Sequence, residues 1–493
     1  MARKGSITVF LTLILSLMLS LVCTSIESVR MAAARTQILS SLDIGLYSLF
    51  GQYDKTLLKD YDLFFLDGSC GGGSLNMAEI YDNMESYIKP VLKQNSQRIA
   101  LKDGGFTGYR LATDEDGTVF YCQVVQYMKD TLGSQGIQLL LNEMKDRENK
   151  TKEAEKTGEQ AQSGDAIGSY EREMNQAAKN SQEALEAAKE NSGQEGEVIS
   201  QPETPAVEAP KVKNPITVIK RIMKMGILEL VIPPGKGISD KSVSKNTLVS
   251  GRKLQEGMPL FGVLEQDTSY ASQVLFQQYL MDKLGNYLNP ASGGLEYQIE
   301  YILGRKDNDL DNLKSVATKL LLVREGVNFA HLLADSGKRA QVEALALAIA
   351  SSFLIPPAAV IIEGALLLCW AFAESILDVR ELFDGGKVPL IKSIEDWQLS
   401  LENLPELLQG LDTQRRGTET GMDYEDYLQV FLLAKGKNEK LSGGMDMVEL
   451  SVRSLPGRSS FCLDSCIASI EASIDVKANS RKTFTVTKQY SYI

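Results

Sequence analysis

The sequence predicts a helix-rich α+β protein. We expect a long N-terminal helix that is first transmembrane and then amphipathic, a mixed ectodomain with small β elements, and a C-terminal hairpin. An uncharged apolar run opens the chain and passes into a stretch with helical periodicity. Further segments repeat apolar residues every three or four positions, whereas strand-like alternation is confined to short runs, most clearly near the C-terminus.

Length and composition indicate how many folded units to expect and exclude or disfavour several classes of protein and site. A chain of 493 residues is too long for one hydrophobic core, so two or three folded units are expected. Hydrophobic residues make up 43% and charged residues 24%, which excludes wholesale disorder. The net charge of −12 disfavours a nucleic-acid-binding protein, which needs a basic face for phosphates. The only histidine, His331, excludes a histidine-based zinc site, and six cysteines are too few for a disulfide scaffold.

The apolar run extends from Ser6 to Cys23 without a charge. Its helix is just long enough to cross a hydrocarbon core of about 30 Å. Arg3 and Lys4 precede it and set the predicted orientation, with a cytoplasmic N-terminus and the bulk of the chain outside the cell. Arg30 and Arg35 follow the run and weigh against that orientation. The predicted membrane anchor comprises Ile7, Val9, Phe10, Leu13, Ile14, Leu17 and Leu21.

Three interpretations of this segment compete. A cleaved secretory signal would use the small residues 32–34, which lie well beyond the apolar end. A lipoprotein signal would end at Cys23, but the bulky Val22 stands where a small residue is usual. A retained helix fits best, because no glycine or proline interrupts the periodic pattern before Gly45. The pattern consists of Ile26, Val29, Ala33, Ile38, Leu42, Leu46 and Leu49.

The layout of the N-terminus resembles that of pilin-like proteins. In these, a short basic leader and a glycine precede an apolar helix that spans the membrane and becomes the spine of an exported domain. Lys4-Gly5-Ser6 is similar to the end of such a leader. Phe10, the fifth residue after Gly5, departs from the glutamate that typical pilins carry there. Cleavage after Gly5 therefore stays open.

Composition divides the chain into five parts. A cytoplasmic basic leader (1–5) and the transmembrane helix (6–23) precede a helix extension with a first α+β unit (24–144). Residues 145–214 form an acidic insertion with a proline-containing linker, predicted to be disordered or a single helix. The core of that insertion has 11 acidic and 5 basic residues between 151 and 200, and no Phe or Trp. A second, mainly helical unit that ends in β-strands occupies 215–493.

Local patterns predict the elements of the first unit. Residues 54–67 should form an amphipathic end to the long helix and then turn. The glycine-rich stretch 68–73 should be a loop, because it lacks the Lys-Ser/Thr of a phosphate-binding loop, and a helix should follow over about 76–95. Residues 109–113 and 118–125, joined by a turn at 114–117, are rich in β-branched and aromatic residues and predict a hairpin.

In the second unit, periodicity predicts helices over 216–231, 270–288, 312–333, 424–435 and around 447–453. Residues 341–373 are the most apolar part outside the N-terminus, and Pro356-Pro357 divide them. Each half is too short for a free-standing span, and Glu363 lies in the second, so two buried core helices are predicted in preference to membrane spans. Alternation over 466–476 and 483–492 predicts the terminal hairpin.

Four segments resemble an uncharacterised bacterial family, the domain of unknown function 5702. They are KGSITVFLTLILSLMLSLVCTSIESVRMAAAR, SLFGQYDKTLLKDYDLFFLD, WAFAESILDVRELFDGGKVPLIKSIEDWQLSLENL and MDYEDYLQVFLL. The resemblance covers nearly the whole chain apart from the acidic insertion. The amino-terminal plan of that family is similar to the minor pseudopilins of the tight-adherence (Flp-type) pilus system, which implies a cell-envelope role. No activity is established for the family, so the resemblance supplies no catalytic residue.

One acidic cluster is the main candidate for chemistry. Glu374 and Asp378 lie four residues apart, on one face of a hydrophobic helix. Paired carboxylates can transfer protons or hold a divalent cation. A buried ion-pair network with Arg324 or Arg380 explains the same residues without chemistry and is the preferred interpretation.

The other candidate residues have structural interpretations. His331, in VNFAHLLAD, fits a packed or partly exposed helix position better than a lone base. Asp307, Asp309 and Asp311 alternate as in a calcium loop but lack its central glycine and final glutamate, so an N-terminal helix cap is predicted.

The sequence around each cysteine predicts whether it lies in the membrane helix, in a core helix or in the part outside the cell. Cys23 belongs to the membrane helix and Cys369 to a core helix. The other four, which lie in parts predicted to be outside the cell, permit one or two disulfides; they are Cys70, Cys122, Cys462 and Cys466. The last two have no second cysteine pair at matching spacing, which disfavours a zinc site.

Together these observations favour a non-enzymatic, single-pass, pilin-like protein of the cell membrane, associated with a tight-adherence (Flp-type) pilus or secretion assembly. Its expected partners are membrane lipid and other pilin-like or envelope assembly proteins, and not nucleic acid. No catalytic, cofactor-binding or metal-binding residue is predicted, and no cofactor. The alternative is a membrane-anchored enzyme that uses the acidic, metal-binding cluster around Glu374 and Asp378.

Overall fold

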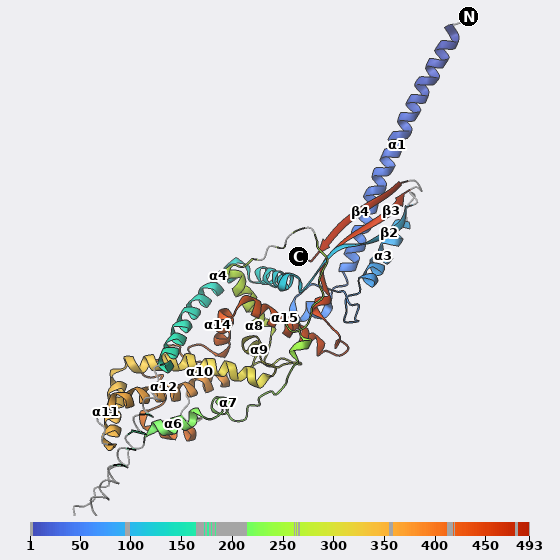
Figure 1. Ribbon diagram of the computed structural model, residues 1–493. Coiled ribbons are helices and arrows are strands. Elements are labelled where there is room, and N and C mark those ends of the chain that lie inside the picture. The colour runs from blue at the N-terminus through green and yellow to red at the C-terminus, as the bar shows by residue number, and fades with distance from the viewer. Residues whose placement is uncertain are drawn as a thin grey trace, which may run out of the picture. The chain divides into compact units, whose positions relative to one another are not determined.

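The computed structural model describes residues 3–93, 99–163, 214–260, 262, 264, 267–353, 358–411, 418, 420–478 and 482–492, with five single positions at 172, 175, 176, 179 and 183. Most of the predicted acidic insertion, and Pro356-Pro357, therefore lie outside the described residues. The chain is a helix-rich α+β protein with a small antiparallel sheet, as the sequence predicts (Figure 1). It divides into two compact units. Unit 1 comprises residues 1–134, 244–283 and 437–493, and unit 2 comprises residues 135–243 and 284–436.

Unit 1 is built on α1 (Arg3–Phe50), a single helix of 48 residues. This confirms the predicted long helix, which passes through Gly45 without a break. The helix ends at Phe50, and a separate short helix, α2 (Lys55–Tyr61), follows it. The prediction that residues 54–67 end the long helix is therefore wrong. The reason is Asp54, whose side chain accepts hydrogen bonds from the next turn and so caps a new helix.

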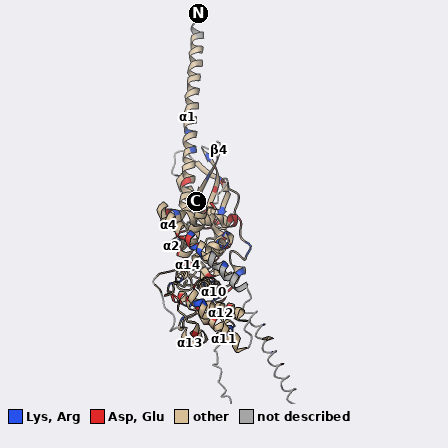
Figure 2. Ribbon diagram, turned by 90° about the vertical axis from the view of Figure 1, so that its left-hand side faces the viewer, with Lys and Arg blue, Asp and Glu red and all other residues tan. Residues whose placement is uncertain are grey.

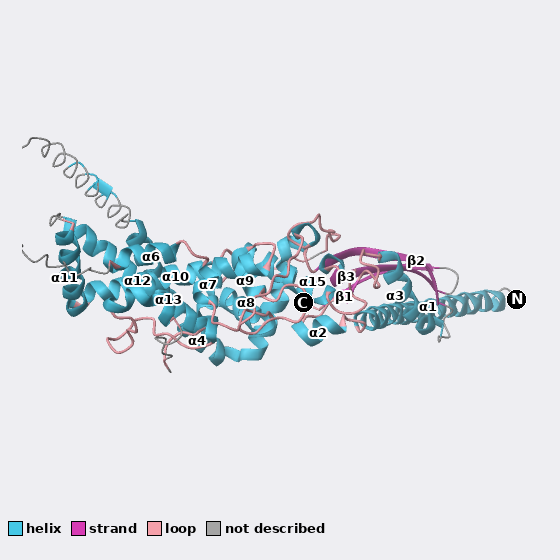
Figure 3. Cartoon of the chain, turned by 90° about the horizontal axis from the view of Figure 1, so that it is seen from below, coloured by secondary structure: helices cyan, strands magenta, loops and turns pink. Residues whose placement is uncertain are grey.

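The sheet of unit 1 joins strands from both ends of the chain. Strand β3 (Cys466–Ala478) pairs antiparallel with β1 (Leu66–Asp67), β2 (Ile99–Leu111) and β4 (Lys482–Ser491). The pair β3–β4 is the terminal hairpin predicted from the sequence. Figure 3 shows the strands grouped beside α1 and α3 (Met77–Lys93).

One face of the sheet is packed against α1 and α3. From Ile470 onward, every second residue of β3 is buried, and those between them are half-exposed. The core between the helices and the sheet is aliphatic and includes Ile38, Leu42, Met84, Ile88, Ile470, Ile474 and Val476.

The prediction of a hairpin from residues 109–113 and 118–125 is wrong. Residues 109–111 do belong to a strand, β2, and Glu115, Asp116 and Gly117 do form a turn with positive φ. Residues 118–125 then continue as helix within α4 (Asp114–Ser163). Phe120, Val124 and Met128 are four residues apart and all buried, so tertiary packing of one helical face overrides their β-propensity. The helix enters the acidic insertion as far as Ser163 and is interrupted once, at Gly133.

The rest of unit 1 consists of short connecting elements and two helices. They are η1 (Lys245–Thr247), α8 (Tyr270–Lys283), α15 (Lys437–Arg453) and η4 (Leu463–Ser465).

Unit 2 is helical. Its elements are α6 (Pro215–Met223), α7 (Ile227–Val231), α9 (Gln298–Gly304), α10 (Asp309–Ala334), α11 (Ser336–Ser352), α12 (Ala359–Asp384), η3 (Leu401–Glu406), α13 (Leu407–Gly410) and α14 (Tyr424–Ala434). The single helix predicted over 216–231 is two helices. Helices α10 and α12 pack side by side (Figure 1). The most apolar window of α12 is 72% buried, so this segment is a core helix, as predicted.

Candidate functional site

The N-terminal half of α1 is the most prominent exposed feature. Its 18-residue apolar window has a mean hydropathy of 2.4 and is 0% buried inside the protein. In Figure 2 the ribbon of this half of the helix is almost entirely tan, because it contains few charged residues. A helix of this length and composition can serve as a membrane anchor or as a signal sequence.

The predicted anchor residues all lie on this free part of the helix. Their exposed fractions range from 43% for Ile14 to 70% for Leu17, and Ile7, Val9, Phe10, Leu13 and Leu21 fall between these values. The side chains of Arg3 and Lys4, which carry the predicted orientation, lie outside the described residues.

The surroundings of α1 change near Ala34. Val29 is 69% exposed, whereas Ala34 and Ile38 are fully buried. Beyond this point the helix approaches α3 closely at Gly45, where an added Cβ would lie 2.4 Å from Cγ1 of Ile88. One helix thus has a free apolar half and a half that forms the spine of unit 1.

The acidic cluster predicted on α12 is a buried ion-pair network in unit 2. Arg324, on α10, donates from Nε and Nη2 to Oδ2 of Asp378, at 3.0 and 2.9 Å. Lys392 pairs with both carboxylates and lies 2.6 Å from Oδ1 of Asp378. Glu374 also accepts hydrogen bonds from the backbone N–H groups of Gln398 and Leu399, both at 2.9 Å. This confirms the ion-pair interpretation, with Arg324 as the arginine partner.

The charges of the network balance. Burial alone would raise the pKa of Asp378, but the positive charges of Arg324 and Lys392 outweigh it and hold this pKa below its usual range. Burial raises the pKa of Glu374, which pairs with Lys392. Each carboxylate therefore already pairs with a cation of the protein itself. The second predicted partner, Arg380, donates instead to the carbonyl oxygen of Leu230 at 2.8 Å.

His331 and the alternating aspartates have structural surroundings. The ring of His331 is half-buried and stacks on Trp397 at 5.1 Å, and burial lowers its pKa. The helix cap predicted among the aspartates is in fact Asn308, whose side chain accepts a hydrogen bond from the backbone N–H of Asp311. Asp309 is fully buried and accepts hydrogen bonds from the backbone N–H groups of residues 296 and 297.

The cysteines provide no metal site. All six lie in the described part of the chain and are free thiols there. Cys466 is buried, and Cys462 accepts a hydrogen bond from Arg453 at 3.4 Å. Within the described ranges, no group of three His, Cys, Asp or Glu side chains is placed to hold a metal ion.

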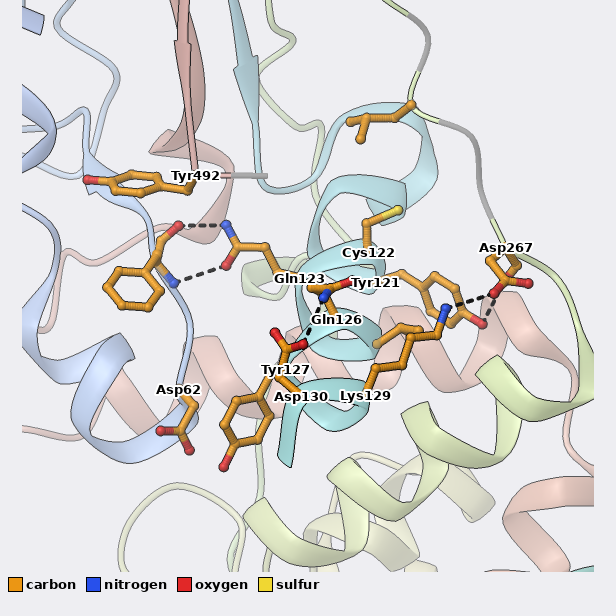
Figure 4. A pocket seen from close by; sticks show the side chains of 13 residues that line it. Asp62, Tyr121, Cys122, Gln123, Gln126, Tyr127, Lys129, Asp130, Asp267 and Tyr492 are labelled. Carbon is orange, nitrogen blue, oxygen red and sulfur yellow. Dashed lines mark hydrogen bonds and ion pairs between the residues drawn. The ribbon is translucent and has the colours of Figure 1, made fainter. Parts of the chain in front are cut away.

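A cavity of about 560 Å³ in unit 1 was not predicted from the sequence (Figure 4). Four aromatic side chains line it, from three parts of the chain: Phe64, Tyr121, Tyr127 and Tyr492. The ring of Phe64 stacks on that of Tyr492, with centroids 5.9 Å apart. Gln123 fixes Phe64 in place, because its side-chain amide bonds both the N–H and the carbonyl oxygen of that residue.

The polar lining of this cavity combines paired and unpaired acids. Figure 4 shows Tyr492 on one side, Lys129 and Asp267 on the other, and Gln126 and Asp130 between them. Lys129 pairs with Asp267 at 3.0 Å. Hydrogen bonds from Ser272 and Ser269 and the contact with Lys129 hold the pKa of Asp267 below its ordinary value, so it is ionised. Burial raises the pKa of Cys122, which keeps its thiol protonated at neutral pH.

Comparison with known proteins gives one match. A family of unknown function (DUF5702) matches residues 205–478, which is more than half of the chain. No curated protein and no solved structure matches the chain. The matched range includes two of the four segments on which the resemblance rests, and it begins after the apolar helix.

Proposed function

Because this chain belongs to the family of unknown function DUF5702, its role has to be inferred from the molecule, and we propose a non-enzymatic, pilin-like, single-pass protein of the cell envelope. In this proposal, the free half of α1 crosses the membrane, with a cytoplasmic N-terminus. Both units lie outside the cell. The protein acts through contacts with membrane lipid and with other pilin-like or assembly proteins of a tight-adherence (Flp-type) pilus or secretion system.

One observation carries the proposal: an 18-residue apolar window of α1 is 0% buried within the protein. Side chains such as Leu17, at 70% exposure, gain no burial from the described protein and need an apolar environment from elsewhere. A lipid bilayer supplies that environment over the whole length of the window.

The arrangement of α1 and the sheet supports the pilin-like part. The free half of α1 continues into the buried half without a break, and the buried half packs with α3 on one face of an antiparallel sheet. A rigid helix with one half free and the other half in the core couples a membrane segment to a folded domain. This is the mechanical feature that the resemblance to pilin-like proteins implies.

The alternative enzyme hypothesis gains little from the geometry. Glu374 and Asp378 already have Lys392 and Arg324 as partners, and both carboxylates are fully buried. The double variant Glu374→Ala with Asp378→Ala should lower stability without removing any metal-dependent activity. A variant that folds normally but loses such an activity would revive the enzyme hypothesis.

Membrane fractionation tests the anchor. The native chain should remain in the membrane pellet after alkaline washing. Leu13→Lys with Leu17→Lys should move it into the soluble fraction, because each lysine costs about 2.5–3.5 kcal/mol near the centre of a spanning helix. Leu139→Lys is the control, since Leu139 is 71% exposed and lies outside α1. Release of the native chain into the cytosol would contradict the proposal.

Orientation needs a separate measurement. Protease added to intact cells stripped of their wall should digest both units if they lie outside. Full protection, with digestion only after lysis, would reverse the proposed topology. N-terminal sequencing of the membrane-bound protein would then show whether the helix is retained, and loss of residues 6–23 would replace the anchor by a signal sequence.

A further inference from the structure

We propose that the cavity of about 560 Å³ in unit 1 binds a small organic cation, an alkylammonium group, between aromatic side chains and the carboxylate of Asp130. This goes beyond the envelope role and does not depend on it. The cavity has a volume typical of small-ligand sites, and residues of unit 1 line it throughout.

The charges around the cavity favour a cation. The described residues of its lining include three carboxylates and one lysine. Asp267 is paired with Lys129, and Asp62 is paired with Lys283. Asp130 accepts one hydrogen bond, from Nε2 of Gln126 at 3.0 Å, and has no cationic partner among the residues that the structure describes. Asp130 is therefore the carboxylate of the described lining with which an added cation can form an ion pair.

The aromatic side chains supply the second half of the site. A ring presents negative charge on its face and attracts a cation within about 6 Å of its centroid. Two rings of the cavity already receive cations of the protein: Lys437 Nζ lies 4.2 Å from the centroid of Tyr121, and Lys283 Nζ lies 5.7 Å from that of Tyr127. The rings of Tyr121 and Tyr127 thus already take part in cation–π contacts with ammonium groups.

Among the described residues, no such cation lies over the ring of Tyr492 or over the more exposed ring of Phe64. Phe64 lines the cavity, and 42% of it is exposed, although its backbone is fixed by Gln123 on both sides. Its ring is backed by that of Tyr492, nearly parallel at 30°. An exposed, preorganised ring in the same cavity as the carboxylate of Asp130 accommodates an alkylammonium group, whose methyl or methylene groups contact the ring while its charge faces Asp130.

Calorimetric titration of the full chain in a non-ionic detergent tests this proposal. The probe is choline, compared with its uncharged isostere 3,3-dimethylbutan-1-ol at constant ionic strength. Choline should bind about tenfold more tightly, because the isostere has neither the cation–π attraction nor the attraction to Asp130. Equal affinity for both compounds, or no binding of choline, would overturn the proposal.

Variants locate the binding. Asp130→Asn and Phe64→Leu should each weaken choline binding about threefold to fivefold. Asp82→Asn and Phe106→Leu are the matched controls, an exposed acid on α3 and a half-buried ring on β2, and should leave the affinity unchanged. Asp130 is exposed, so its variant should fold normally. Choline binding unaffected by Asp130→Asn would place the cation elsewhere and refute the assignment of this cavity.

Discussion

Arg324 donates two hydrogen bonds to one oxygen of Asp378, and both side chains are completely buried in unit 2. The remaining Nη1 group of Arg324 donates to the carbonyl oxygen of Pro389 at 2.9 Å. The pair therefore holds the chain that follows α12 against α10. The desolvated charges tolerate burial because they satisfy each other, which makes the network sensitive to the loss of any single member.

Asp378→Ala should destabilise unit 2 by about 3–5 kcal/mol, because it leaves two buried cations with one carboxylate. Both tryptophans, Trp370 and Trp397, lie in unit 2, so urea unfolding followed by tryptophan fluorescence reports on this unit. Lys241→Ala, which removes a largely exposed pair with Glu296 in the same unit, is the control and should cost less than about 1 kcal/mol. Similar losses from both variants would contradict the structural role of the network.

Two isoleucines on α1 provide a matched comparison. Ile38 is fully buried against the sheet, and Ile44 is 45% exposed on the same helix. Ile38→Ala should lower the free energy of unfolding by about 2–5 kcal/mol because it leaves a cavity in the core. Ile44→Ala should lower it by well under half of that amount. Hydrogen exchange of peptides from α1 and β3 measures the effect in unit 1. Equal effects would mean that α1 is not the spine of the sheet.

Gly45→Ala tests the close contact of α1 with α3. Alanine favours a helix over glycine by about 1 kcal/mol, yet the new Cβ would lie 2.4 Å from Ile88, so a net loss of about 1–3 kcal/mol is expected. In an Ile88→Ala background, Gly45→Ala should destabilise unit 1 by less than it does in the native chain, since the clashing atoms are absent. Gly105→Ala, where no atom lies within 4 Å, is the control. A stabilised Gly45→Ala variant would contradict the observed packing.

Glu300 should make unit 2 sensitive to pH. Burial raises the pKa of Glu300 to about 7, although Tyr424 and the backbone N–H of Tyr287 donate hydrogen bonds to it. The ordinary carboxyl pKa is 4.5, so the folded state binds a proton that the unfolded state releases. This contribution to stability is full below pH 4.5 and is lost as the pH rises through about 7, by about 3 kcal/mol in total.

Glu300→Gln should abolish this loss, because glutamine retains the shape and stays neutral. Urea unfolding at pH 5 and pH 8 measures the difference for the native chain and the variant. Glu402→Gln replaces an exposed acid in the same unit and should leave the pH profile unchanged. A native chain that is more stable at pH 8 than at pH 5, with the same profile in Glu300→Gln, would refute the burial of a neutral Glu300.

The features predicted correctly from the sequence are those with a local signal. The long helix follows from an apolar run and an uninterrupted period, and the terminal hairpin from two alternating segments close in sequence. The apolar segment around α12 is predicted to be core because two prolines divide it into halves too short to span a membrane and Glu363 lies in the second, and its burial agrees. Arg324, which pairs with Asp378, is one of the two arginines that the sequence allows as partners of the acids on α12; Arg380 is the other.

The features predicted wrongly, or not at all, depend on contacts between distant residues. Residues 118–125 have β-branched and aromatic side chains that suit a strand, and only packing against neighbouring elements makes them helical. The cavity beside Phe64 needs Tyr492 from the other end of the chain, and no local pattern relates the two.

The sequence by itself determined that an uncharged helix of membrane length opens the chain and that its periodicity continues to a core face, because both properties reside in consecutive residues. Only the tertiary structure decided that β2 pairs with β3 across more than three hundred residues, and that Lys392 neutralises the acids of α12. The free energy of such contacts depends on which surfaces meet in the folded chain, and that information is not local.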